Sequence, residues 1–230
     1  MNISFVTLLA LQNVTERHHF RRLHVVPMPS EFDWRNEGVV GPVEKQGTCQ
    51  SCWAFSAAGS IDYLIKKEHP DLAVDVQALL DCTPHTLGCE GGVMGSVFAY
   101  SGIFPVTHAQ HYTGSKHKCE RSNKGVRVTD YKVILANPEK YLDYIVHEMG
   151  PTTVAIDIRG MVVRNGMIHE CGTDPNHAVL VVGYTPSYWI IKNSFGTHWG
   201  DKGYAYISRD GNMCGINTYA AVATDIEWYK

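Results

Sequence analysis

Residues 46–56 of the chain read Gln-Gly-Thr-Cys-Gln-Ser-Cys-Trp-Ala-Phe-Ser, and this stretch is the most informative part of the sequence. A turn that contains Gly47 leads into Ser51-Cys52, and a long run with apolar residues at helical spacing follows. This pattern predicts a helix from Ser51 to Lys67. Cys52 would then lie at a helix N-terminus, where the N–H groups and the helix dipole favour thiolate over thiol.

Two later segments supply the other groups that thiol chemistry needs. Residues 176–179 read Asn-His-Ala-Val, and residues 192–196 read Lys-Asn-Ser-Phe-Gly. A thiol nucleophile needs a base, and the base needs a group that holds its ring, so we expect His177 as the base and Asn193 as the orienting amide. Each residue alone is more often a core or turn residue, and only the joint occurrence favours catalysis.

With these segments the sequence resembles a known family, the papain-like cysteine peptidases. In that family the histidine and asparagine follow the cysteine by roughly 130–150 residues, and His177 and Asn193 follow Cys52 at close to that separation. The resemblance extends from about Pro29 to the C-terminus. It includes, in family order, Asp33-Trp34-Arg35, Leu80-Asp81-Cys82, Gly88-Cys89-Glu90-Gly91-Gly92 and Trp199-Gly200-Asp201-Lys202-Gly203-Tyr204.

The resemblance implies a cysteine endopeptidase that hydrolyses peptide bonds through an acyl-enzyme thioester. Cys52 would attack the carbonyl carbon as thiolate, and His177 would pair with it as imidazolium and then protonate the leaving amine. Asn193 would accept a hydrogen bond from the other ring nitrogen. Gln46 would donate its side-chain amide to the oxyanion, with the backbone N–H of Cys52 as second donor. The family chemistry needs no cofactor and no metal.

Substrate contacts also follow from the resemblance. Gly91 and Gly92 would lie along an extended substrate backbone, as glycines because a side chain would block its approach. The pocket for the second residue before the scissile bond would be lined by Met94, Ala155, Pro175 and Tyr219. This lining is apolar, is shortened by the tyrosine and has no acid to receive arginine, so it predicts aliphatic or modest aromatic substrate side chains.

Two residues depart from the family pattern near the site. Gln50 stands where the family usually has glycine before the Ser-Cys pair, which places a side chain at the rim of the cleft. Phe195 stands where the family has a tryptophan that covers the Asn–His hydrogen bond. Neither change removes a catalytic group, and both would be expected to lower turnover.

Cys52 leaves six of the seven cysteines for pairing, and their number alone does not fix the connectivity. The resemblance selects Cys49–Cys89, Cys82–Cys119 and Cys171–Cys214. Three bridges imply an oxidising compartment, namely a lysosome or vacuole or the secreted space. Cys49 and Cys52 also match a CxxC redox motif, but a thioredoxin-like domain would be shorter and βαβ-patterned, and a zinc site is less favoured still.

Composition agrees with an ordinary globular enzyme. The chain has 230 residues, 44% of them apolar and 19% charged, with a net charge of −3. It therefore fits one large domain or two packed subdomains, and its charge gives no argument for nucleic acid. No apolar run approaches the length of a membrane span. We expect a monomer whose partners are protein or peptide substrates and protein inhibitors.

The periodicity of the sequence divides the chain into a helical first half and a strand-rich second half, and the family resemblance implies an α+β fold of papain-like type. Helices are expected near 75–81, 92–101 and 138–148, and strands at 126–131, 153–158, 178–184, 188–192, 204–208 and 220–224. A helical subdomain would span about 27–125, and a β-barrel-like subdomain about 126–230. Cys52 and His177 belong to different halves, which places the active site in the cleft between them.

Residues 1–26 would hold a signal peptide with a short propeptide remnant, or the cut end of a longer propeptide. Two other activities stay open beside the endopeptidase: a catalytically impaired homologue that acts as a binding protein, and an aminopeptidase in which the N-terminal segment caps one end of the cleft. A carboxydipeptidase is disfavoured, because the stretch between Cys82 and Cys119 leaves no room for a large blocking loop.

Overall fold

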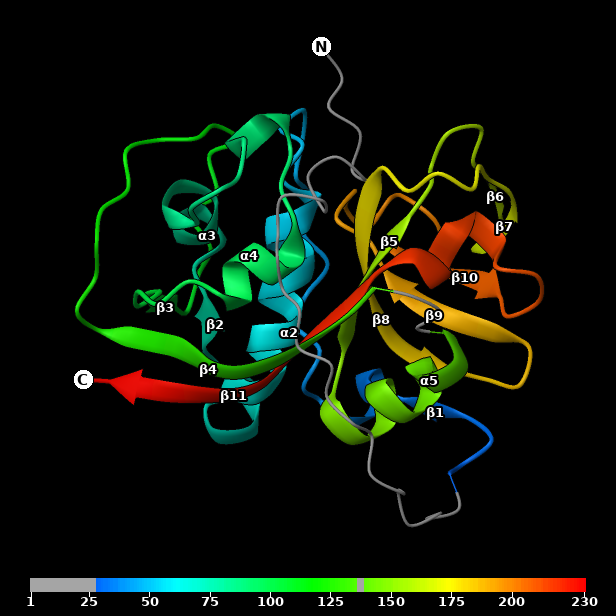
Figure 1. The fold of residues 1–230 in the computed structure, drawn as a ribbon, viewed down its shortest axis with the longest axis horizontal. Helices are drawn as coiled ribbons and strands as arrows, with labels where there is room; N and C mark the ends of the chain where they lie inside the picture. The colour runs from blue at the N-terminus through cyan, green and yellow to red at the C-terminus, as the bar shows by residue number, and fades with distance from the viewer. Residues whose placement is uncertain (1–27, 136–138) are drawn as a thin grey trace.

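The computed structural model describes residues 28–135 and 139–230, and these form a helical half and a β half side by side (Figure 1). The helical half has three helices, a short 3₁₀ turn and a two-stranded ribbon: α2 (Cys52–Glu68), α3 (Val76–Cys82), α4 (Met94–Phe98), η2 (Gly88–Glu90), β2 (Ala73–Val74) and β3 (Val106–Thr107). Helices and a mixed sheet together confirm the predicted α+β class.

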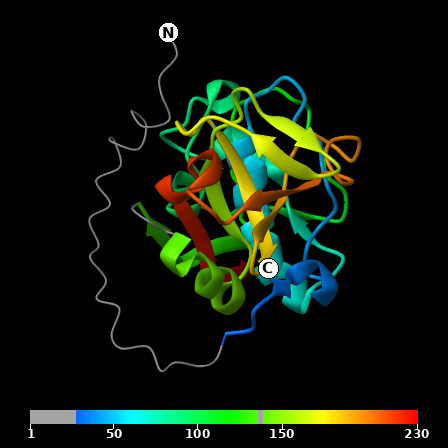
Figure 2. The same cartoon turned by 90° about the vertical axis from the view of Figure 1, so that its right-hand side faces the viewer.

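The long helix α2 joins the two halves. It runs alongside β8 (His177–Tyr184), as Figure 2 shows. Small residues on this helix permit the close approach, since a Cβ added to Gly59 would lie 2.5 Å from a methyl carbon of Leu180. The Ser56 hydroxyl donates to the carbonyl of Val179 at 2.8 Å, which fixes the crossing. These contacts hold the first residues of α2 and the first residues of β8 beside each other.

The described residues place nine strands in one sheet, ordered β4-β11-β5-β8-β9-β10-β7-β6, with β1 paired to β8. Their bounds are β1 (Phe32–Asp33), β4 (Gly125–Ile134), β5 (Thr152–Ile156), β6 (Val162–Arg164), β7 (Met167–Glu170), β9 (Tyr188–Lys192), β10 (Tyr204–Ser208) and β11 (Ala220–Tyr229). No pairing joins β4 to β6 in this part of the chain, so the sheet is open where the sequence analysis expected a barrel-like half. Every residue of the central strand β8 is buried, which agrees with the apolar run that follows His177.

Each half has its own apolar core, but the cores do not follow the predicted boundary near residue 125. Val126 and Val128 of β4, and Trp228 of β11, pack with the helical core around Trp53. In the other direction, the N-terminal Trp34 packs into the core of the β half, where its Nε1 donates to the carbonyl of Val146 at 2.6 Å. The chain therefore crosses between the halves at both ends.

Several elements differ in length from the sequence prediction. The helix expected at 92–101 is only α4, and the strand expected at 220–224 extends to Tyr229 because β11 pairs along all of β4. The helix expected at 138–148 is α5 (Glu139–Tyr144), which continues as a π-helical turn, η3 (Ile145–Met149). Pro138 and residues 1–26 lie outside the described part. No helix among the described residues is long and apolar enough to cross a membrane.

Candidate active site

The structure brings Cys52, the first residue of α2, next to His177, the first residue of β8. Both are buried, with 7% and 3% of their surface exposed, and Cys52 is the free cysteine of the chain. Burial raises the pKa of the Cys52 thiol. The charge of His177, its hydrogen bond to the sulfur, and the backbone N–H groups of Ala178 and Trp53 outweigh this, so the pKa lies below the usual value.

The pKa of His177 moves in the opposite direction. Burial lowers it, but the negative charge of Cys52 and hydrogen bonds to Cys52 and Asn193 raise it above the ordinary value. Opposite shifts in two contacting groups mean that each stabilises the charged form of the other. The two pKa shifts therefore favour a thiolate–imidazolium pair over a neutral thiol and imidazole.

Asn193 fixes which nitrogen of the ring faces the sulfur. The backbone N–H of Ser194 donates to Asn193 Oδ1 at 2.8 Å, so this atom is the amide oxygen, and it lies 2.8 Å from His177 Nε2. An amide oxygen only accepts, so Nε2 must carry a proton. The other ring nitrogen, Nδ1, is then the one left for Cys52. The Nδ2 of Asn193 has no hydrogen-bond partner among the described residues.

Aromatic rings cover this hydrogen bond. The ring of Phe195 lies over that of His177, with centroids 4.8 Å apart and planes inclined by 33°. Trp199 meets Phe195 edge-on at 5.7 Å. The sequence analysis singled out Phe195 but not Trp199, which appeared there only as part of a family segment. Two rings together form the apolar cover that the family builds around a tryptophan.

Gln46 is held by bonds at its side chain and its main chain. Ser194 Oγ donates to Gln46 Oε1 at 2.6 Å, and Gln46 Nε2 donates to the Cys49 carbonyl at 2.8 Å. The backbone N–H of Gln46 also donates to the Ser194 carbonyl at 2.9 Å. An amide nitrogen has two hydrogens, so one stays for an oxyanion. The contact made by Ser194 was not predicted from the sequence, where the one available signal was its place next to Asn193.

The structure contains three disulfides, Cys49–Cys89, Cys82–Cys119 and Cys171–Cys214, which are the pairs that the family resemblance implies. Gln50 is exposed, and its backbone N–H donates to the Cys89 carbonyl at 2.9 Å. The first bridge and this bond tie the nucleophile loop to the segment that carries Gly91 and Gly92.

The two glycines of that segment are needed for different reasons. Gly91 has φ of 127°, a backbone conformation that residues with a side chain rarely adopt. A Cβ on Gly92 would lie 2.6 Å from the ring of Trp53. Packing against Trp53 is therefore one reason for glycine at position 92, and the predicted approach of a substrate stays a prediction.

The residues predicted to line the specificity pocket are buried. Met94, Ala155 and Tyr219 belong to one apolar cluster and have no exposed surface, and Pro175 is buried as well. The Tyr219 hydroxyl accepts a hydrogen bond from the backbone N–H of Gly95 at 2.9 Å, which anchors the ring against α4. The apolar character expected of this lining agrees with its burial, and the shortened recess stays a prediction.

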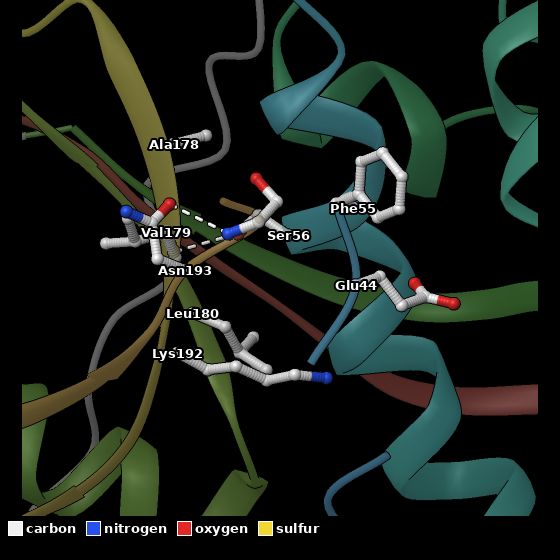
Figure 3. A pocket seen from close by; sticks show the side chains of 9 residues that line it. Glu44, Phe55, Ser56, Ala178, Val179, Leu180, Lys192 and Asn193 are labelled. Carbon is white, nitrogen blue, oxygen red and sulfur yellow. Dashed lines mark hydrogen bonds between the residues drawn. The ribbon is translucent and has the colours of Figure 1, made fainter. Parts of the chain in front are cut away.

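A small cavity of about 20 Å³ lies between α2 and the strands β8 and β9, next to Asn193 (Figure 3). Charged side chains from both halves line this cavity. Glu44 comes from the loop before Cys52, and Lys192 comes from β9. Nearby, burial raises the pKa of Asp62 on α2 to about 7, although Lys192 and Lys66 counteract this effect. Burial also lowers the pKa of Lys192. Among the described residues no cluster of His, Cys, Asp and Glu is placed to hold a metal ion.

Comparison with known proteins agrees with this geometry. Residues 28–224 match the family model described as papain family cysteine protease. The chain is 38% identical to mouse cathepsin K over 84% of its length, and 38% identical to a cathepsin L-like proteinase of Fasciola hepatica over 85%. It spans 64% and 65% of those two proteins, less than two thirds of their length.

Solved structures give the same result. Digestive procathepsin L2 of Tenebrio molitor superposes with a TM-score of 0.77 at 35% identity, covering 87% of this chain and 70% of that one. A cysteine protease of Carica candamarcensis, in complex with E-64, superposes with a TM-score of 0.78 at 29% identity, covering 86% of this chain and 99% of that one.

Proposed function

The chain belongs to the papain family of cysteine proteases, and from this we propose that it is a cysteine endopeptidase. One observation carries the proposal: the buried Cys52 and His177 have pKa values shifted toward the ion pair. A binding protein with a dead site would have no need of a buried thiolate–imidazolium pair. The same pair makes the sulfur a nucleophile at neutral and mildly acidic pH.

In the proposed reaction the Cys52 sulfur attacks the carbonyl carbon of the scissile peptide bond. The carbonyl oxygen becomes an oxyanion, which accepts hydrogen bonds from the free Nε2 hydrogen of Gln46 and the backbone N–H of Cys52. His177 gives its Nδ1 proton to the leaving amine, and a thioester forms. His177 then takes a proton from water, which attacks the thioester and releases the acid.

Asn193 and Phe195 keep His177 in position throughout this cycle. The amide oxygen holds the Nε2 proton, so the ring does not rotate away from the sulfur when its charge changes. Phe195 excludes water, which would compete for that hydrogen bond. A Phe195→Trp variant, with the family's usual ring, should raise kcat modestly and leave the pH profile in place.

We propose that the apolar lining of this pocket restricts the substrate. Met94 and Tyr219 are buried apolar side chains, so aliphatic or modest aromatic side chains should be preferred at the second position before the scissile bond. Gly91 would pair with the extended substrate backbone, since nothing lies within 4 Å of the position of its missing Cβ. The exposed Gln50 would border the neighbouring position.

The disulfides support a place in an oxidising compartment, lysosomal, vacuolar or secreted. Expected partners are peptide and protein substrates and protein inhibitors.

The test is cleavage of a panel of fluorogenic dipeptides under mild reductant, each offered with a blocked and with a free N-terminus. An endopeptidase should cleave the blocked members, whereas activity confined to free amines would identify an aminopeptidase. Cys52→Ser should abolish both cleavage and labelling by E-64, because a serine hydroxyl is far less ionised than this thiol. An active Cys52→Ser protein would refute the proposed nucleophile.

A further inference from the structure

Tyr112 connects the two segments that flank the nucleophile. It lies 61 residues after Ser51, in the loop that follows β3. Its hydroxyl is 2.6 Å from Ser51 Oγ and 3.0 Å from the carbonyl oxygen of Gln46. Its ring packs edge-on against Phe55 at 4.8 Å. One side chain from a distant loop therefore contacts both the residue before Cys52 and the residue with the proposed oxyanion donor.

The direction of these two hydrogen bonds follows from proton counting. A carbonyl oxygen only accepts, so Tyr112 gives its single hydrogen to Gln46. The Ser51 hydroxyl must then donate to the Tyr112 oxygen. Tyr112 stays protonated, because burial and the negative charge of Cys52 raise its pKa, against a smaller opposite effect of the Ser51 bond.

Ser51 occupies the N-cap position of α2 but does not cap it. A serine at this position ordinarily accepts a hydrogen bond from the second or third N–H of the helix. Here the side chain makes no such bond. The third N–H, that of Ala54, goes to the main-chain oxygen of Ser51 at 2.9 Å. The second, that of Trp53, lowers the pKa of the Cys52 thiol.

The Ser51 hydroxyl and the Cys52 sulfur are thus alternative acceptors for the Trp53 N–H. We propose that Tyr112 is a positioning residue, which holds the Ser51 hydroxyl away from the first turn of α2 so that this N–H serves the sulfur of Cys52. The inference rests on the proposed function, because it takes the thiolate as the reactive form. It adds a residue that touches neither substrate nor sulfur.

Among the described residues, no further charged group is placed to change the pKa of Cys52 when Tyr112 is replaced. The first turn of α2 carries no acidic residue. From β8 the titratable group that faces the sulfur is His177, and from the loop it is Tyr112 itself. A change at Tyr112 that leaves His177 in place should therefore act through the N–H groups of the helix.

The experiment measures the rate at which iodoacetamide alkylates Cys52 as a function of pH, with the disulfides intact. Tyr112→Phe releases the Ser51 hydroxyl to cap the helix, so the acid limb of the profile should move to higher pH. Below that limb the alkylation rate should fall about 3- to 10-fold, as expected from the worth of a serine cap. Tyr188→Phe is the matched control and should follow the wild type. It removes a tyrosine hydroxyl on β9 that makes no hydrogen bond to another described residue.

Ser51 separates this explanation from simple loosening of the loop. The double variant Tyr112→Phe/Ser51→Ala has no hydroxyl to compete for the N–H, so its acid limb should return toward the wild-type position. A double variant that stays as shifted as Tyr112→Phe would overturn the inference, as would a Tyr112→Phe profile that overlays the wild type. A wild-type profile without an acid limb below that of an ordinary thiol would instead reject the ion pair of the proposed function.

Discussion

The bond from Ser194 to Gln46 allows a quantitative test of the oxyanion site. Ser194 Oγ donates to Gln46 Oε1 at 2.6 Å, and both residues are buried. A separate main-chain bond of 2.9 Å joins the same two residues and survives any change of side chain. Ser194→Ala therefore removes one of the two side-chain bonds that orient the amide, and the bond from Gln46 Nε2 to the Cys49 carbonyl remains. Gln46→Ala removes the amide itself.

The two variants should lower kcat to very different extents. Loss of an oxyanion donor costs ~2.7–4 kcal/mol of transition-state stabilisation, so Gln46→Ala should lower kcat about 100- to 1000-fold. Ser194→Ala leaves the Nε2 donor of Gln46 in place but removes the hydrogen bond to Gln46 Oε1. This loss of about 1 kcal/mol should lower kcat roughly 5-fold. Ser194 acts only through Gln46. The double variant should therefore be no slower than Gln46→Ala alone.

The assay is steady-state hydrolysis of an N-blocked fluorogenic dipeptide, with the active fraction determined by titration of Cys52. Both losses should appear in kcat, with KM nearly constant, because the oxyanion exists only after attack. Ser187→Ala, an exposed serine in the turn between β8 and β9, is the control and should have no effect. Additive losses in the double variant, or a Ser194→Ala loss as large as that of Gln46→Ala, would refute this account of the site.

Three further outcomes are expected. The pH profile of kcat/KM should be a bell, because Cys52 ionises below the usual thiol pKa and His177 holds its proton above the usual imidazole pKa; a rate that rises steadily to pH ~9 would contradict the ion pair. Tyr219→Ala should enlarge the predicted specificity pocket, because it removes a buried ring, and raise kcat/KM about 10-fold or more for substrates with phenylalanine at the second position relative to alanine; an unchanged ratio would show that the ring does not border that pocket. The folded protein should be more stable toward urea at pH 4 than at pH 7, by on the order of 1–3 kcal/mol. The pKa of Asp62 is raised to about 7, so this group stabilises the fold at low pH, and its contribution is lost as pH rises through this value. Asp62→Asn should flatten the pH dependence of stability, and an unchanged slope would exclude Asp62 as its source.

The sequence alone predicted the residues that meet in the site and most of the elements that carry them. The run after Ser51 specified α2 to within a residue of its end, because a broad apolar face at helical period has no competing interpretation. The strands at β8, β9 and β10 were predicted to within a residue for the same local reason. The resemblance of the family segments then predicted that Cys52, His177 and Asn193 meet in one cleft.

The support of the site depends on the tertiary fold. Ser194 on Gln46, Tyr112 on Ser51 and Tyr219 on Gly95 are contacts between residues 61 to 148 positions apart. No periodicity or turn rule reaches that far along the chain. The exchange of Trp34 and Trp228 between the two cores has the same origin. Local pattern fixes which face of an element is apolar, whereas packing in three dimensions fixes which distant side chain fills the space beside it.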